Sequence, residues 1–335
     1  MNARSESCVA LALPAFRAAL ELSAELDGAT PDLPGAQWLA SRGHRVAGPH
    51  GGWRTWLLSI LGPGADALQR CPAGASVRAL ATGFREDGCW ACAQPVHLVT
   101  GLDHLRLAPP SAVELAPAET EALAESIETA LAGSGYSLRP CGSDPWTLAC
   151  PVEIDCDTVE PAQAVGRDIR DFLPAGRDGA LVRKLTNELQ MLLHEHPVNT
   201  GRVALGLAPV NSFWLWGFGC ARATEPTPLP ALFTDDPWLR GLWRLHGAES
   251  APLAAAASAL ATEPTLLIAA ADADKDSRTQ LARWESGLCA PLAVALHRGG
   301  VRSARILLGD AEYAVSKGAR FAIWRRRRSW SELLA

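Results

Sequence analysis

Short apolar runs alternate with longer stretches of helical period along much of the chain, and this alternation predicts the fold class. Three runs have the length and apolar content of buried strands, namely residues 9–13, 265–271 and 304–308. Helical patterns occupy residues 15–26 and 278–297. Strands that alternate with helices at this spacing are typical of an α/β core.

The middle of the chain has a different pattern of short alternating runs. Paired strands are expected within residues 95–109, and two more at 136–140 and 146–150. Between the two pairs, Pro117 opens a helix whose first turns are acidic, which suits the positive end of the helix dipole. Residues 88–163 are therefore predicted to form a small α+β domain.

The clearest helical pattern follows Asp178, a residue type that caps helix N-termini. Leucines recur every three to four positions, as in a buried stripe, until Pro197 ends the pattern. The opposite face carries Asn187 and Gln190. A solvated helix face is the simpler interpretation of these two amides, and a ligand-binding face is the alternative.

A dense group of polar residues follows this helix. His196, Asn199 and Arg202 come within seven positions, and arginine offers a two-pronged donor that suits anions. Asn211 then stands in the apolar, aromatic run 209–219, which is expected to be a core strand that ends in glycines. Anion binding by this group is one hypothesis, and a packing turn beside core tryptophans is the other.

Composition and charge exclude several classes of protein for this chain. Of the 335 residues, 48% are hydrophobic and 20% are charged, which excludes global disorder. A formal charge of −5 argues against bulk binding of nucleic acid or of anionic membranes. No run of 18 strongly apolar residues is present, and Pro14 and Arg17 interrupt the first apolar run, which disfavours a signal peptide. We expect a cytoplasmic protein without a membrane partner, and interpret the basic cluster 325–328 as a solvated edge.

Cysteine and aspartate clusters are candidates for metal or redox sites. Nine cysteines are an odd count in a long chain, which favours free thiols over a disulfide framework. The C-x-x-C of Cys89 and Cys92 lacks a second pair at zinc-site spacing, so structural cysteines are expected. Asp272, Asp274 and Asp276 follow a predicted strand end, where α/β proteins often bind metals, but a solvated loop is favoured.

Three blocks carry a family resemblance: residues 166–174, 185–206 and 209–219. They resemble the bacterial family of RpfE-type regulatory proteins, whose members also bear the name phosphoglycerate mutase. More distantly, they are similar to the archaeal-type cofactor-independent phosphoglycerate mutases. The resemblance extends from about residue 90 to residue 330.

The resemblance implies an alkaline-phosphatase-like α/β core interrupted by an inserted domain. On that basis the core comprises residues 1–87 and 164–335, and the inserted α+β domain comprises residues 88–163. The resemblance also places part of the polar group described above near the cleft between domains. The residues placed there are His196, Asn199, Arg202 and Asn211.

The chain departs from the two-metal chemistry that the resemblance implies. The family needs an aspartate after the first strand, where this chain has Pro14, and a serine nucleophile in a G-S-D turn, where it reads Gly52-Trp53-Arg54. The histidines expected within residues 271–276 and 309–311 are also missing. Because two cations need several carboxylate and imidazole ligands, these departures predict a degenerate core.

We therefore predict a non-catalytic homologue of the mutases that acts as a ligand-binding or regulatory protein and needs no cofactor. A small phosphorylated metabolite is the expected ligand, and a protein partner is a second expectation. The alternative is an active metal-dependent mutase or phosphohydrolase that uses manganese or zinc in a rebuilt site, with Ser59 or Thr55 as nucleophile. The candidate ligand-binding residues are Asn187, Gln190, His196, Asn199, Arg202 and Asn211.

Overall fold

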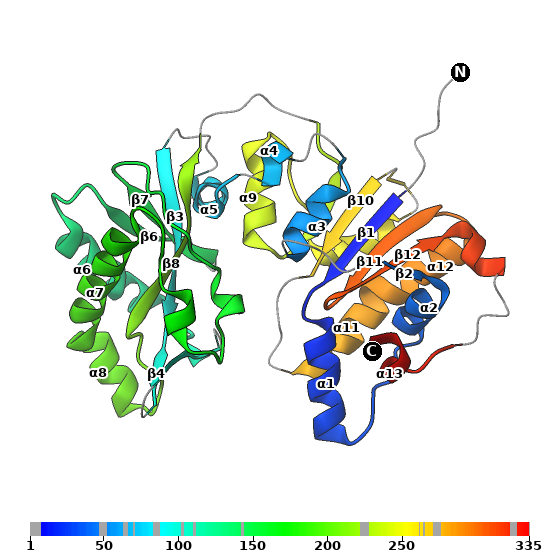
Figure 1. Cartoon of the computed structure of the whole chain (residues 1–335), viewed down its shortest axis with the longest axis horizontal. Helices are drawn as coiled ribbons and strands as arrows, with labels where there is room; N and C mark the ends of the chain where they lie inside the picture. Colours follow the sequence, from blue (N-terminus) through cyan, green and yellow to red (C-terminus); the bar gives the residue numbers. More distant parts are fainter. Residues whose placement is uncertain are drawn as a thin grey trace. The chain divides into compact units, whose positions relative to one another are not determined.

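The computed structural model divides the chain into two compact units (Figure 1). It describes residues 8–46, 52–62, 66–69, 71–82, 88–101, 104–109, 112–141, 144–221, 228–260, 262–263, 265–270, 276–321 and 327–334. The first unit is made of Met1–Arg70, Thr227–Trp243 and Ala248–Ala335. The second is made of Cys71–Pro226 and Arg244–Gly247.

The first unit is built on a six-stranded sheet in the order β2-β12-β11-β1-β10-β9. Its strands are β1 (Cys8–Leu13), β2 (His44–Val46), β9 (Ala231–Thr234), β10 (Thr265–Ala269), β11 (Ser303–Leu308) and β12 (Ala311–Ser316). Strands β11, β1, β10 and β9 run parallel, and β12 and β2 continue the sheet antiparallel. The carboxyl ends of the four parallel strands therefore meet at one edge.

Helices cover the sheet because its central strands are apolar on both faces. Val9, Leu11 and Leu13 of β1 join the main core cluster, and Ala10 and Ala12 between them are also fully buried. The helices are α1 (Phe16–Asp27), α2 (Pro34–Arg42), α3 (Trp53–Ser59), α4 (Asp66–Gln69), α9 (Pro237–Leu245), α10 (Ala256–Ala259), α11 (Ser277–Trp284), α12 (Ala290–Arg298) and α13 (Trp330–Leu334). Helix α1 packs on α11 and α2 packs on α12, while α3 lies against β1. The mixed sheet with its helices confirms the predicted α/β core.

The second unit is a four-stranded antiparallel sheet in the order β6-β7-β3-β8. Its strands are β3 (Gly88–Val96), β6 (Ser137–Cys141), β7 (Asp144–Cys150) and β8 (Ser212–Ala221), with a separate hairpin of β4 (Leu98–Thr100) and β5 (Leu105–Leu107). Its helices are α5 (Ala73–Thr82), α6 (Pro117–Leu131), α7 (Gly179–His194) and α8 (Pro197–Ala204).

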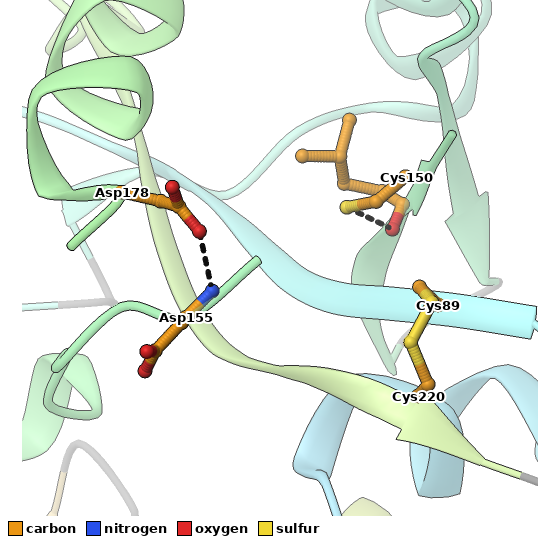
Figure 2. The surroundings of a disulfide bond; sticks show 6 residues. Cys89, Cys150, Asp155, Asp178 and Cys220 are labelled. Carbon is orange, nitrogen blue, oxygen red and sulfur yellow. Dashed lines mark hydrogen bonds between the residues drawn. A yellow bond between two sulfur atoms is a disulfide. The ribbon is translucent and has the colours of Figure 1, made fainter. Parts of the chain in front are cut away.

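Helix α7 forms where the leucine period predicts it. Leu185, Leu189 and Leu193 are buried in the core of the second unit, together with side chains of the sheet and of α6. Asp178 stands at the N-cap position, but its carboxylate accepts a hydrogen bond from the Asp155 backbone N–H at 2.8 Å (Figure 2). The cap residue thus ties an upstream loop to the start of the helix.

The bounds of the small unit in the structure differ from those of the insert predicted at residues 88–163. Strand β8, expected in the α/β core, pairs with β3 from Gly88↔Ala221 to Val96↔Ser212. The buried stripe of α7 packs in that same unit. The small unit therefore takes in residues 71–87 and 164–226 as well, because a sheet pairing between distant segments decides the boundary.

The expectation of free thiols needs one correction. Cys89 and Cys220 form a disulfide, which their direct pairing on neighbouring antiparallel strands makes possible. The other seven cysteines, all among the described residues, are thiols outside any disulfide: Cys8, Cys71, Cys92, Cys141, Cys150, Cys156 and Cys289.

Over the described ranges, no helix combines the length and the apolar character that a membrane crossing requires.

Candidate functional site

The carboxyl edge of the parallel strands is where α/β proteins usually place their chemistry. Strand β1 ends at Leu13, and Pro14 follows it without a carboxylate. Strand β9 ends at Thr234, whose hydroxyl donates to the Ala269 carbonyl of β10 and accepts the backbone N–H of Asp236. These bonds tie the Asp236 backbone to the ends of β9 and β10.

Asp236 is buried and is neutralised by Arg54 of α3. The Arg54 Nη2 lies 2.6 Å from Oδ2 of Asp236, and its Nε lies 3.1 Å from the same oxygen. The other oxygen, Oδ1, accepts the Leu239 N–H at the start of α9 at 2.8 Å. The Arg54 guanidinium also lies over the rings of Trp53 and Trp238, so it is held by both charge and aromatic contact.

A second carboxylate follows a strand end at this edge and is also paired with arginine. Asp310 lies in the turn between β11 and β12, and its Oδ1 is 3.2 Å from the Arg17 Nη1. Arg17 bonds Glu21 one helical turn further on at 2.9 Å. These hydrogen bonds to carboxylates raise the pKa of the Arg17 guanidinium. This pair is exposed, so it contributes little to stability but still commits the carboxylate to an arginine.

A metal ion at this edge would need a ligand set among the described side chains. In the described ranges, no three or more His, Cys, Asp or Glu side chains gather in a way that could hold a metal ion. Asp272 and Asp274 lie outside the described residues. Asp276 is described and caps α11, where it accepts from the Thr279 hydroxyl and from the Arg278 N–H. The bond from Thr279 is the main cause that lowers the pKa of the Asp276 carboxyl.

The six residues singled out from the sequence all lie in the second unit, on or next to α7, α8 and β8. Asn187 is on the exposed face of α7, while Gln190 donates to the Ser212 hydroxyl of β8 at 2.9 Å. Asn211 makes two bonds to Leu98, accepting from its N–H at 2.7 Å and donating to its carbonyl at 2.8 Å. Gln190 and Asn211 thus join elements of the small unit to one another.

His196 is the N-cap of α8. Its Nδ1 accepts the Val198 N–H at 3.2 Å, and its Nε2 lies 2.9 Å from the Ser126 hydroxyl of α6. An Nδ1 that accepts a hydrogen bond carries no proton, so the ring is neutral in this arrangement. Burial also lowers the pKa of His196, which favours the same neutral state.

Asn199 and Arg202 are buried and bond mainly to backbone groups. Asn199 bridges the end of α7 and the approach to β8 through the carbonyls of Leu193 and Val210. Arg202 bonds the Glu119 carboxylate of α6 at 2.9 Å and donates to two backbone carbonyls, those of Glu114 and Ala208. The four residues expected to share a site therefore bond to different elements: His196 and Arg202 to α6, Asn199 to the ends of α7 and β8, and Asn211 to β4.

Sequence reasoning missed the pair of Arg54 and Asp236. The two residues are 182 positions apart, so no local pattern links them. The available signals were an arginine directly after Trp53 and an aspartate just before Pro237 at a helix start.

Taken together, the chain has an α/β core with a parallel-strand edge lined by arginine–carboxylate pairs, and a small α+β unit. No protein-family model matches the chain. The sequence is 30% identical over 173 residues to the 2,3-bisphosphoglycerate-independent phosphoglycerate mutase of Methanosarcina barkeri, covering 50% of this chain and 42% of that protein. It is 34% identical over 111 residues to the enzyme of the same name from Methanothrix thermoacetophila, covering 33% of this chain and 28% of that protein.

The matches thus span less than half the length of these curated relatives. Among solved structures, the PH0037 protein from Pyrococcus horikoshii has a TM-score of 0.52 and 14% identity, with 99% of this chain and 92% of that chain covered. At that identity the likeness shows the fold alone. Over at most half of its length, the chain is thus similar at low identity to the cofactor-independent phosphoglycerate mutases.

Proposed function

We propose that this chain is a non-catalytic relative of the cofactor-independent phosphoglycerate mutases that acts as a ligand-binding or regulatory protein. Its ligand is a small phosphorylated metabolite, or it acts through a protein partner, as the resemblance to RpfE-type regulatory proteins suggests. It has no membrane partner and does not depend on nucleic acid.

The observation that carries the proposal is the pairing of Arg54 with Asp236. A carboxylate that accepts an arginine at 2.6 Å and a helix N–H at 2.8 Å has both oxygens committed. Metal binding there would leave a half-buried guanidinium without its counter-ion, which is costly. Asp310 is also paired with Arg17, at an exposed position, and Pro14 offers no oxygen ligand from its side chain.

The nucleophile that the resemblance implies is also replaced. Trp53 opens α3 at the position expected for serine. Ser59, the alternative candidate, is at the other end of α3 and donates its hydroxyl to the Trp56 carbonyl at 2.6 Å. Serine-based phosphoryl transfer needs a hydroxyl activated by a base or a metal, and this hydroxyl is bonded to its own helix.

Two measurements on the full chain test the proposal. After dialysis against manganese and gel filtration, elemental analysis should find fewer than one ion per chain. With manganese present, interconversion of 2- and 3-phosphoglycerate should stay at the background rate. Two retained ions, or turnover that Ser59→Ala or Thr55→Val abolishes, would show an active metal enzyme and overturn the proposal.

The ligand is sought by thermal shift. A ligand that binds only the native state raises the unfolding midpoint. We expect 3-phosphoglycerate or a related phosphorylated acid to raise it without manganese, and glycerate at the same concentration to leave it unchanged. A shift that needs manganese would instead favour the metal-dependent alternative.

A further inference from the structure

Three cysteines stand side by side across three strands of the small unit. Cys89 on β3 is the register partner of Cys220 on β8 and, on its other side, of Cys150 on β7. Figure 2 shows this order, with the Cys89–Cys220 disulfide on one side of β3 and Cys150 on the neighbouring strand. Directly opposed residues of antiparallel strands project to the same face of the sheet, so the three sulfur atoms share one face.

Cys150 is a free thiol with partial access to solvent. Its Sγ contacts the Leu148 carbonyl of its own strand at 3.8 Å, a weak bond that is easily given up. Opposed residues of antiparallel strands have Cα atoms about 4.5–5.5 Å apart. That separation lies within the range that a disulfide spans, about 4.4–6.8 Å. Cys150 is therefore in register for a disulfide with Cys89, on the side of β3 opposite Cys220.

We propose that Cys150 is the exchange partner of the Cys89–Cys220 disulfide, so that the bond moves between the β3–β8 and β3–β7 strand pairs. In the forward step Cys150 loses its proton to solvent, and its thiolate attacks the Sγ of Cys89 along the disulfide. The Cys89–Cys150 bond forms as the Cys89–Cys220 bond breaks. The electron pair leaves on the Sγ of Cys220, which takes a proton from solvent.

The exchange keeps one disulfide and one thiol in the row, so it needs neither an oxidant nor a reductant. Burial raises the pKa of the Cys150 thiol to about 12. Since only the thiolate attacks, the exchange is slow at neutral pH, and the Cys89–Cys220 bond of the structure persists there.

Exchange changes what holds an edge strand. Strand β8 is the last strand of its sheet and ends at Ala221, next to Cys220. The Cys89–Cys220 disulfide links that end covalently to β3. After exchange, the end of β8 keeps its backbone ladder and the bond from the Gly217 N–H to the Thr158 hydroxyl at 3.2 Å, but loses its covalent tie. Exchange among the three cysteines therefore decides whether the end of β8 is covalently linked to β3.

Peptide mapping distinguishes the two bonds because trypsin separates the three cysteines. Cys89 lies in the peptide 86–106, Cys220 in 203–222 and Cys150 in 107–167, where Arg139 precedes proline and resists cleavage. The full chain is incubated at pH 9 for a day without added thiol or oxidant, quenched in acid, alkylated and digested without reduction. Repeating this at two protein concentrations excludes exchange between chains.

We expect the 86–106/203–222 cross-link to decline while 86–106/107–167 appears, with the number of free thiols unchanged. Cys150→Ser should abolish the second cross-link. Cys156→Ser, which alters another cysteine of the same peptide, should leave it intact. A wild-type chain that keeps only the Cys89–Cys220 link throughout would overturn the proposal, as would a second cross-link that survives Cys150→Ser.

Discussion

Asn199 joins the end of α7 to the approach to β8, and its replacement decides whether it serves the fold or a ligand. Its Nδ2 donates to the Leu193 carbonyl at 2.7 Å and to the Val210 carbonyl at 2.6 Å, and its Oδ1 accepts the Val210 N–H at 2.8 Å. The side chain is only 6% exposed, so water cannot replace these bonds. We expect Asn199→Ala to destabilise the small unit.

The magnitude follows from the three bonds. A buried hydrogen bond contributes about 1 kcal/mol net, so losing three costs about 3 kcal/mol. Asn199→Asp keeps the size of the side chain and the acceptor but sets a carboxylate oxygen against two carbonyls, so it should cost at least as much. Asn187→Ala, on the exposed face of α7, is the matched control and should stay within about 0.5 kcal/mol.

Urea unfolding followed by tryptophan fluorescence and by far-UV circular dichroism measures these differences. The midpoint should fall for both Asn199 variants with the slope unchanged. A loss below about 1 kcal/mol for Asn199→Ala, together with loss of the thermal shift caused by a phosphorylated ligand, would refute the structural role and return Asn199 to the ligand-binding candidates.

Two further predictions concern neighbouring side chains. Burial lowers the pKa of His196, so below the ordinary value of 6.5 the unfolded chain takes up a proton that the folded chain does not. The free energy of unfolding should therefore fall as the pH drops from 6.5 through the folded pKa, and His196→Gln should flatten that part of a urea-midpoint profile; an unchanged profile would contradict the neutral cap. Arg202→Met should cost about 3 kcal/mol, because it removes the ion pair with a partly buried Glu119 and the hydrogen bonds to two backbone carbonyls. A double-mutant cycle with Glu119→Gln should give a coupling above about 0.5 kcal/mol, and additive losses would show that the ion pair contributes nothing.

Local periodicity was enough to place three strands of the six-stranded sheet and the long helix of the small unit. The apolar runs at 9–13, 265–271 and 304–308 became β1, β10 and β11, and the leucine period after Asp178 became α7. In each case the signal lies within one element, where side-chain period and burial coincide.

Long-range pairings were beyond that reasoning. Strand β8 was predicted to belong to the α/β core, but it pairs with β3 in the small unit. The sequence of residues 209–219 does not indicate that β3 is its partner. The same pairing sets Cys89 opposite Cys220, 131 positions away. The odd cysteine count favoured free thiols, so the prediction missed this disulfide. Arg54 and Asp236 are a third case, since their bond depends on how α3 lies near the end of β9.

The resemblance to the mutases and the question of catalysis concern different parts of this molecule. The three similar blocks all fall in the second unit, where Asn199 and Asn211 bond backbone groups and Arg202 bonds α6. Those contacts join α6, α7, α8 and β8, so these residue types have a structural role there. Phosphoryl transfer depends instead on the ligands at the carboxyl edge of the six-stranded sheet. At that edge Asp236 and Asp310 accept arginines, and Pro14 and Trp53 stand where the resemblance implies a ligand and a nucleophile. The similar blocks therefore bear on the fold of the small unit, and the arginine pairs at the sheet edge are what support the proposed non-catalytic role.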